Sequence, residues 1–172
     1  MYLKRKKDQK KKMRKRKTKS SGKITHKNKT VDGIKFDSIM ESEFYTYVKE
    51  LKEQGKIIDF ELQPKFLLQD KFIIVDGKVI EGSNKDFNKI KKESKAETVR
   101  AINYIADFKL ICKDEIYIID VKGIKTADFK LKEKMFIHKY PEYKFYCVQK
   151  YTGEWMDFNE AEKLRKEKKK NK

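Results

Sequence analysis

The sequence is short of the residues that build disulfide frameworks, zinc sites and membrane spans. Its two cysteines, Cys112 and Cys147, lie 35 positions apart. This spacing fits neither a disulfide framework nor a zinc motif, so we expect free thiols in a reducing, cytoplasmic compartment. No apolar run approaches the roughly 20 residues that cross a membrane, and the charged N-terminus lacks the apolar segment of a secretory signal. The glycine patterns that bind nucleotides are also absent. We therefore expect neither a membrane partner nor a nucleotide cofactor.

Acidic residues are scarce only at the two ends of the chain. The protein has 172 residues, with 45 Lys and Arg against 27 Asp and Glu, and a net charge of +18. Residues 1–30 carry fifteen basic residues and one acid, residues 163–172 carry seven and one, and residues 31–162 therefore have a net charge of −2. This distribution predicts one near-neutral folded domain, spanning residues 31–158, between two basic extensions.

The N-terminal extension, residues 1–30, is too rich in like charges to bury a core, so we predict that it is disordered when free. Polyanions suit it as partners, since each Lys or Arg that neutralises a phosphate releases a counterion. We expect a nucleic-acid-binding arm, and the alternative is a tail that only keeps the protein in solution. The C-terminal extension, residues 159–172, is predicted to be a basic helix. The phosphate contacts expected from the N-terminal extension are Lys4, Arg5, Lys6, Lys7, Arg14 and Arg16.

Hydrophobic periodicity between the extensions is typical of an α/β domain. Ser38 followed by Glu41 forms a capping box, and the apolar spacing after it predicts a helix over 38–54. Residues 81–97 are polar and almost without apolar members, so we predict a surface insertion loop. Further apolar patterns predict strands at 57–62, 65–75, 99–111, 115–121 and 143–148 and a helix at 127–139. This order predicts a mixed β-sheet core flanked by helices.

Two acids interrupt the most apolar segments. Asp107 lies within the predicted strand over 99–111, and Asp120 lies near the end of the strand over 115–121. A carboxylate in such surroundings requires a partner or a metal. Because the turn at residues 113–114 lies about midway between them, antiparallel pairing places the two acids opposite each other. Two adjacent carboxylates repel unless a divalent cation lies between them, and magnesium prefers such oxygen ligands.

Lys122 adds a third functional group to this pair. Side chains alternate along a strand, so Asp120 and Lys122 share one face. A lysine there can orient or deprotonate an attacking water, and it can offset negative charge on a phosphate in the transition state. The two acids and the lysine together predict a site for phosphodiester chemistry.

These motifs resemble those of the PD-(D/E)xK nuclease superfamily. The resemblance rests on the segment ADF at 106–108, although alanine stands where proline is common, and on the segment IIDVKG at 118–123. Ser38-x-x-Glu41 is similar to the acidic helix of this superfamily. Residues 31–150 as a whole are similar to a phage endonuclease group related to Holliday junction resolvases. The resemblance implies a restriction-endonuclease-like fold with the element order αβββαβ.

The resemblance also implies roles for single residues. Asp107, Asp120 and the main-chain carbonyl of Val121 would bind Mg²⁺ or Mn²⁺, and Lys122 would position the attacking water. Glu41 would reach the site from its helix, directly or through water. The alternative for Glu41 is a capping role alone.

Glu43 is the alternative to Glu41 as the acid of the helix. The two lie roughly 200° apart on a helical wheel, so only one of them is expected to face the site, and the Ser-x-x-Glu pattern favours Glu41. Lys125, Lys130 and Lys132 would supply a basic surface for DNA after the motif. For the last two, the alternative is an ordinary solvated helix face.

We therefore predict a metal-dependent endodeoxyribonuclease. A branched DNA such as a Holliday junction is the best specific substrate, because the resemblance is to phage resolvases, and symmetric cutting of two strands implies a two-fold homodimer. One alternative is a nuclease of the same fold with a restriction, packaging or transposase-like role. The other is a non-enzymatic DNA- or RNA-binding protein that uses only its basic ends.

Overall fold

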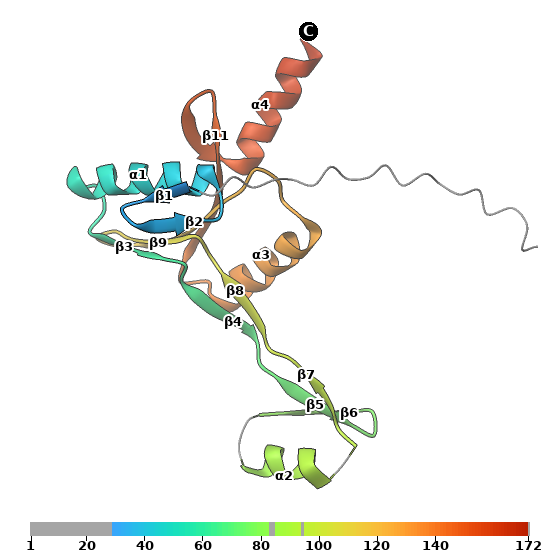
Figure 1. Cartoon of the computed structure of the whole chain (residues 1–172). Coiled ribbons are helices and arrows are strands. Elements are labelled where there is room, and N and C mark those ends of the chain that lie inside the picture. The colour runs from blue at the N-terminus through green and yellow to red at the C-terminus, as the bar shows by residue number, and fades with distance from the viewer. Residues whose placement is uncertain (1–28, 83–84, 94, 172) are drawn as a thin grey trace, which may run out of the picture.

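The α/β class predicted from the sequence is confirmed by the structure, a computed structural model that describes residues 29–82, 85–93 and 95–171 (Figure 1). A five-stranded mixed sheet, smaller sheets and four helices make up the described part of the chain. The N-terminal extension lies outside the described residues apart from Lys29 and Thr30, and all six of its expected phosphate contacts lie outside them as well. Within the described residues, no helix has the length and apolarity to cross a membrane.

The helices and strands succeed one another as β1 (Lys29–Val31), β2 (Ile34–Phe36), α1 (Ile39–Glu53), β3 (Asp59–Leu62), β4 (Lys65–Gln69), β5 (Phe72–Val75), β6 (Lys78–Glu81), α2 (Lys85–Glu93), β7 (Glu97–Val99), β8 (Ile102–Ile105), β9 (Phe108–Ile111), β10 (Ile116–Val121), α3 (Ala127–Lys139), β11 (Lys144–Tyr151), β12 (Glu154–Asp157) and α4 (Phe158–Lys170). The predicted helices over 38–54 and 127–139 are α1 and α3. The first described strand, β1, begins at Lys29, two residues before the predicted start of the folded domain, and pairs with β2. The C-terminal helix, α4, begins at Phe158, one residue before its predicted start.

The five-stranded sheet has the order β12-β11-β10-β9-β3, in which β10 and β11 are parallel and the other neighbours are antiparallel. Helix α1 packs on one face, over a core that includes Phe44 and Ile119. Helix α3 packs on the other face, over a core that includes Phe136 and Ile118. Residues from Ile118 to Val121 in β10 are all buried, as expected of a central strand covered on both faces.

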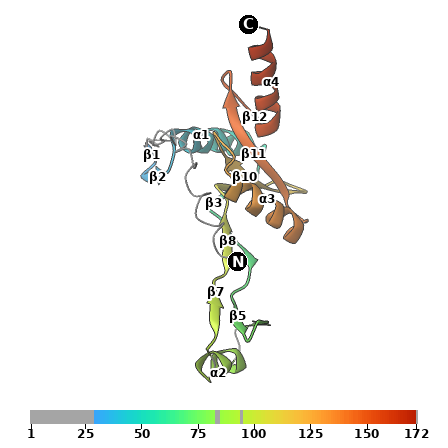
Figure 2. The same ribbon diagram turned by 90° about the vertical axis from the view of Figure 1, so that its right-hand side faces the viewer.

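A long extension, which we call the β-arm (residues 65–105), leaves the sheet between β3 and β9. It consists of the two-stranded ribbon β4–β8 and a tip (residues 72–99) that contains the sheet β6-β5-β7 and helix α2. Figures 1 and 2 show the β-arm projecting from the rest of the protein, with α2 at its far end. We call the other described residues, 29–64 and 106–171, the body.

The tip shows that the prediction of a loop over 81–97 was wrong. These residues contain the end of β6, all of α2 and the start of β7. The physical reason is a small core: Phe87 in α2 and Ile73 in β5 are 3% and 0% exposed and belong to neither core of the body. The apolar residues Phe87 and Ile90 are too few for a sequence pattern, but one buried ring is enough to hold a short helix on a sheet.

The strands predicted over 65–75 and 99–111 are both divided. The first is interrupted at Asp70 and Lys71, where the ribbon meets the tip. The second becomes β7, β8 and β9, and Asp107 lies between the last two. Asp107 is therefore at a junction between strands rather than inside one, and this junction is where the β-arm rejoins the body.

Candidate functional site

The carboxylates of Asp107 and Asp120 are brought together by the pairing of β9 with β10. Phe108 pairs with Ile119, so the next positions in this antiparallel register are Asp107 and Asp120. The Asp107 carboxylate accepts a hydrogen bond at 2.7 Å from the main-chain N–H of Val121. The juxtaposition agrees with the prediction made from the turn at 113–114.

The Lys122 ammonium lies against both carboxylates. Its Nζ is 3.3 Å from Oδ2 of Asp107 and in direct ionic contact with Oδ1 of Asp120. The Asp120 side chain is 1% exposed, whereas those of Asp107 and Lys122 are 16% and 30% exposed. The cluster is thus closed on the side of Asp120 and open to solvent on the side of Asp107 and Lys122, where a substrate can reach it.

Tyr104 holds the other oxygen of Asp120. Its hydroxyl donates a hydrogen bond of 2.6 Å to Oδ2, and its ring is 4% exposed and packs against Phe66 and Phe136. Sequence reasoning missed this residue. The available signal was a tyrosine in an apolar strand three positions before Asp107, which by itself is more typical of packing.

The ionisation of the cluster follows from its burial and its charges. Burial is the main cause that raises the pKa of Asp107 to about 7, the charge of Asp120 adds to the effect, and Lys122 opposes it. Burial acts to lower the pKa of Lys122, but the two carboxylates together outweigh it, and the net shift is upward. Burial, followed by the charge of Asp120, raises the pKa of Tyr104. At neutral pH the lysine and the tyrosine are therefore protonated, and Asp107 is divided between its carboxylic acid and carboxylate forms.

Glu41 and Glu43 lie in different surroundings. Glu41 lines a small cavity of about 80 Å³ together with Asp107, and its charge contributes to the raised pKa of Asp107. It also takes part in the N-cap of α1: the Ser38 hydroxyl donates to its carboxylate at 2.8 Å and accepts from its main-chain N–H at 3.1 Å. Glu43 instead forms an ion pair with Lys150 at 2.9 Å. The structure thus brings Glu41, and not Glu43, to Asp107.

Two further residues of this cavity were not predicted as site residues. Gln63 and Lys35 line it beside Glu41 and Asp107. Gln63 has φ +51°, a left-handed conformation that is uncommon for a residue of its kind. Three other non-glycine residues with positive φ in the described chain each precede a glycine in a hairpin turn, whereas Gln63 precedes Pro64. A strained backbone that opens onto a cavity with acidic residues is typical of functional sites.

The predicted basic surface after the motif is only partly available. Lys125 does not fit a role in DNA contact, because its side chain is 8% exposed and forms an ion pair of 2.7 Å with Glu133. Its ammonium also lies 5.7 Å from the centre of the Phe129 ring and 5.3 Å from that of the Phe158 ring, and these rings cover it. Lys132 forms an exposed i,i+4 pair with Asp128, and Lys130 is exposed.

The donor atoms of the cluster suit a small, hard cation. Within the described residues, no group of three or more His, Cys, Asp or Glu side chains could hold a metal. Magnesium, however, is bound through one or two carboxylates, with waters and substrate phosphates as its other ligands. Oδ1 of Asp120 is buried and takes no hydrogen bond of normal geometry in the described structure, and the ammonium of Lys122 is the cation that offsets its charge. The residues present therefore fit Mg²⁺ or Mn²⁺.

Residues 19–153 match the model of a family described as a protein of unknown function, DUF1064. The matched region is well over half of the chain and includes the acidic cluster, the cavity beside it and the whole β-arm. No curated protein and no solved structure matches the chain.

Proposed function

The chain belongs to the DUF1064 family, and from the geometry of its site we propose that it is a metal-dependent endodeoxyribonuclease that hydrolyses phosphodiester bonds with Mg²⁺ or Mn²⁺. The observation that carries the proposal is the convergence of Asp107, Asp120 and Lys122 at one partly open point. A protein that only binds nucleic acid does not need this group. Burying carboxylates costs several kcal/mol unless they are paired or bind a metal, so the convergence favours catalysis over binding alone.

The order of the elements supports a place in the PD-(D/E)xK superfamily. Helix α1, strands β3, β9 and β10, helix α3 and strand β11 follow one another as αβββαβ, and the β-arm is an insertion between β3 and β9. The two acids lie at the junction before β9 and in β10, and Lys122 follows β10 directly. This agrees with the order of acidic and basic residues on which the resemblance rests.

Each residue of the cluster has a separate role in the proposed reaction. Asp107 and Asp120, together with the Val121 carbonyl, would hold the metal. When bound, a divalent cation supplies positive charge to offset the charge that develops on the phosphate. Lys122, held protonated by the two carboxylates, donates hydrogen bonds to the attacking water or to a phosphate oxygen. Tyr104 fixes the orientation of Asp120 through Oδ2, which leaves Oδ1 to face the ammonium of Lys122.

The finer parts of the proposal concern the substrate and the assembly. We propose branched DNA, with the four-way junction as the first candidate, a two-fold homodimer that cuts two strands symmetrically, and a cytoplasmic location. Their support is the resemblance to phage resolvases and the sparse cysteine content of the chain.

The test is cleavage of linear, nicked, flap and four-way DNA with and without Mg²⁺. We expect cleavage that requires the metal and that Asp107→Asn or Asp120→Asn abolishes while DNA binding is largely kept. Cleavage at the wild-type rate by either variant, or equal cleavage in EDTA, would contradict the proposal. Preference for linear duplex over the junction would contradict only the proposal of a branched substrate.

A matched pair of variants tests the helix acid. Glu41→Gln is expected to lower the cleavage rate, because Glu41 lines the cavity with Asp107. Glu43→Gln is the control, since Glu43 is paired with Lys150 away from this cavity, and its rate should stay within a few-fold of the wild type. The reverse result would assign the role to Glu43.

A further inference from the structure

The β-arm is joined to the body directly beside the acidic cluster. The main-chain N–H of Gln63 donates to the carbonyl of Asp107 at 3.0 Å, and that of Ala106 donates to the carbonyl of Pro64 at 3.1 Å. These hydrogen bonds hold the two ends of the β-arm together next to Asp107. A macromolecule bound at the cluster therefore lies where the β-arm begins.

The ribbon of the β-arm has a fixed direction because it packs on α3. Phe66 in β4 contacts Phe136 edge to face, with ring centroids 4.8 Å apart. The Tyr140 hydroxyl donates to the carbonyl of Leu67 at 3.0 Å. The ribbon is thus anchored at its base, and the tip beyond it is carried away from the body in a set direction (Figures 1 and 2).

The tip is a small folded unit rather than an irregular loop. Its buried residues Ile73 and Phe87 lie outside both cores of the body, and the ammonium of Lys71 lies 5.6 Å from the centre of the Phe87 ring. This packing holds α2 on the tip sheet. The lysines of α2 are therefore presented on a folded surface, which costs less entropy on binding than a flexible loop does.

The lysine side chains of the tip that the structure describes form no ion pair, in contrast to several of the body. Within the described residues, every ion pair joins two residues of the body. Lys89, Lys91 and Lys92 on α2 and Lys95 after it are all exposed. Helix α2 has four lysines against two acids, Asp86 and Glu93, and this net positive charge suits a polyanion.

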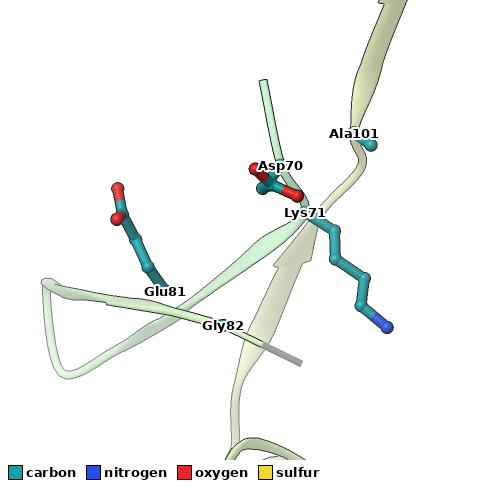
Figure 3. Close-up of a pocket in the computed structure, with 5 residues that line it drawn as sticks. All are labelled: Asp70, Lys71, Glu81, Gly82 and Ala101. Atoms are coloured by element: carbon teal, nitrogen blue, oxygen red, sulfur yellow. The ribbon is translucent and has the colours of Figure 1, made fainter. Parts of the chain in front are cut away.

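Two acids of the β-arm, Asp70 and Glu81, lie at the elbow between ribbon and tip. Asp70, Lys71, Glu81, Gly82 and Ala101 line an open pocket there. Figure 3 shows the carboxylates of Asp70 and Glu81 on one side of this elbow, with Lys71 pointing to the other. The mixed charge of the elbow favours phosphate less than the net positive charge of α2 does.

We propose that α2 contacts the phosphate backbone of a DNA duplex about one helical turn from the phosphate that is cut. The inference rests on the proposed nuclease function, because the distance along the DNA is counted from the phosphate cut at the cluster around Asp107. Residues 65–75 at about 3.3 Å per residue reach at most about 35 Å, and one turn of B-DNA is about 34–36 Å long. A duplex that leaves the cluster along the β-arm therefore meets α2 after about ten base pairs.

The test compares two double variants of the full chain with the same change in charge. Lys89→Gln/Lys92→Gln removes two cations from α2. Lys56→Gln/Lys113→Gln removes two exposed cations at the opposite end of the five-stranded sheet. Binding to an immobile four-way junction is measured against salt in EDTA, so that no cleavage is needed. Two lost phosphate contacts should lower the salt slope by about 1.8 and weaken binding about tenfold or more near 0.1 M salt, while the control stays within twofold of the wild type.

Hydroxyl-radical footprinting on the same junction shows where α2 contacts the DNA backbone. We expect the wild type to protect a backbone segment about ten base pairs from the site of cleavage, and the α2 variant to lose that protection while it keeps the rest. Lys89→Arg/Lys92→Arg should keep both the salt slope and the footprint, because it keeps the charge.

An unchanged salt slope and an unchanged footprint in the α2 variant, with a wild-type far-UV spectrum, would overturn the inference. A protein that shows the α2 footprint but never cuts DNA would instead overturn the nuclease proposal and leave α2 as a duplex contact. The two failures are thus separate observations.

Discussion

The body and the β-arm tip use charged and aromatic residues in opposite ways. In the body, aromatic rings form two cores on the faces of one sheet, and the ion pairs of the described residues are all found there, including the cluster around Lys122. In the tip, two buried hydrophobic residues hold a helix on which Lys89, Lys91 and Lys92 are exposed. A rigid, dense body suits chemistry that requires fixed positions. A small, independently packed tip suits contact with a polymer, where charge and reach matter more than exact placement.

Of the variants considered, Lys122→Ala should have the largest effect, because it removes a residue of the cluster in the body. We expect the single-turnover cleavage rate to fall by about two to four powers of ten, as when a positioned catalytic group is lost. Lys109→Ala is the control, because Lys109 is also a lysine of the central sheet that pairs with an acid, Glu61, but lies outside the cluster. Similar rates for both variants would mean that Lys122 only balances charge.

Tyr104→Phe should weaken the metal site without disturbing the core around it. The ring remains, but Asp120 loses the hydrogen bond that orients it, and loss of such a partner typically lowers metal affinity 10- to 100-fold. Titration with Mn²⁺ by calorimetry measures the effect in the absence of DNA. Tyr143→Phe, in the same aromatic cluster, should bind Mn²⁺ like the wild type. If both variants bind equally well, Tyr104 is only a packing residue.

The stability of the metal-free protein should depend on pH through Asp107. Its pKa is raised in the folded state, to about 7 against an ordinary 3.8, so the folded chain holds this proton at pH values where the unfolded chain has lost it. The stabilisation is complete below about pH 4 and is lost as the pH rises toward 7. Between pH 5 and 8 the free energy of unfolding should therefore fall by about 1–3 kcal/mol more in the wild type than in Asp107→Asn.

Urea unfolding in EDTA at several pH values measures this difference. Added Mg²⁺ should reduce it, because a cation at the cluster favours the ionised carboxylate. If the free energy of unfolding depends on pH in the same way in both proteins, the surroundings of Asp107 do not raise its pKa.

Phe87→Ala should have the smallest effect on the body. Trp155, the one tryptophan of the chain, packs against Phe44 in the body, so its fluorescence reports unfolding of the body. Phe136→Ala removes a fully buried ring and should cost about 3–5 kcal/mol. Phe87→Ala should leave the tryptophan transition within about 2 °C of the wild type while hydrogen exchange in residues 72–99 accelerates. A large loss of body stability in Phe87→Ala would show that tip and body share one core.

Local signals were sufficient to predict three of the four helices of the described residues and the centre of the site. Ser38 and Glu41 mark the start of α1, and α3 has the bounds that its periodicity indicates. Asp107 and Asp120 could be paired from sequence because they are close in the chain on either side of one short turn, so that strand register alone brings them together.

Long-range packing decided the remaining parts, because the contacts involved join distant segments with no common pattern. The choice between Glu41 and Glu43 depended on how α1 is rotated over the sheet. Tyr104 serves Asp120 because the ribbon folds against α3, and the same α3 buries Lys125 against Glu133. The β-arm is the clearest case: residues 81–97 contain too few apolar side chains to indicate a fold, and they form a helix because Phe87 finds a place on a sheet built from segments on both sides of it.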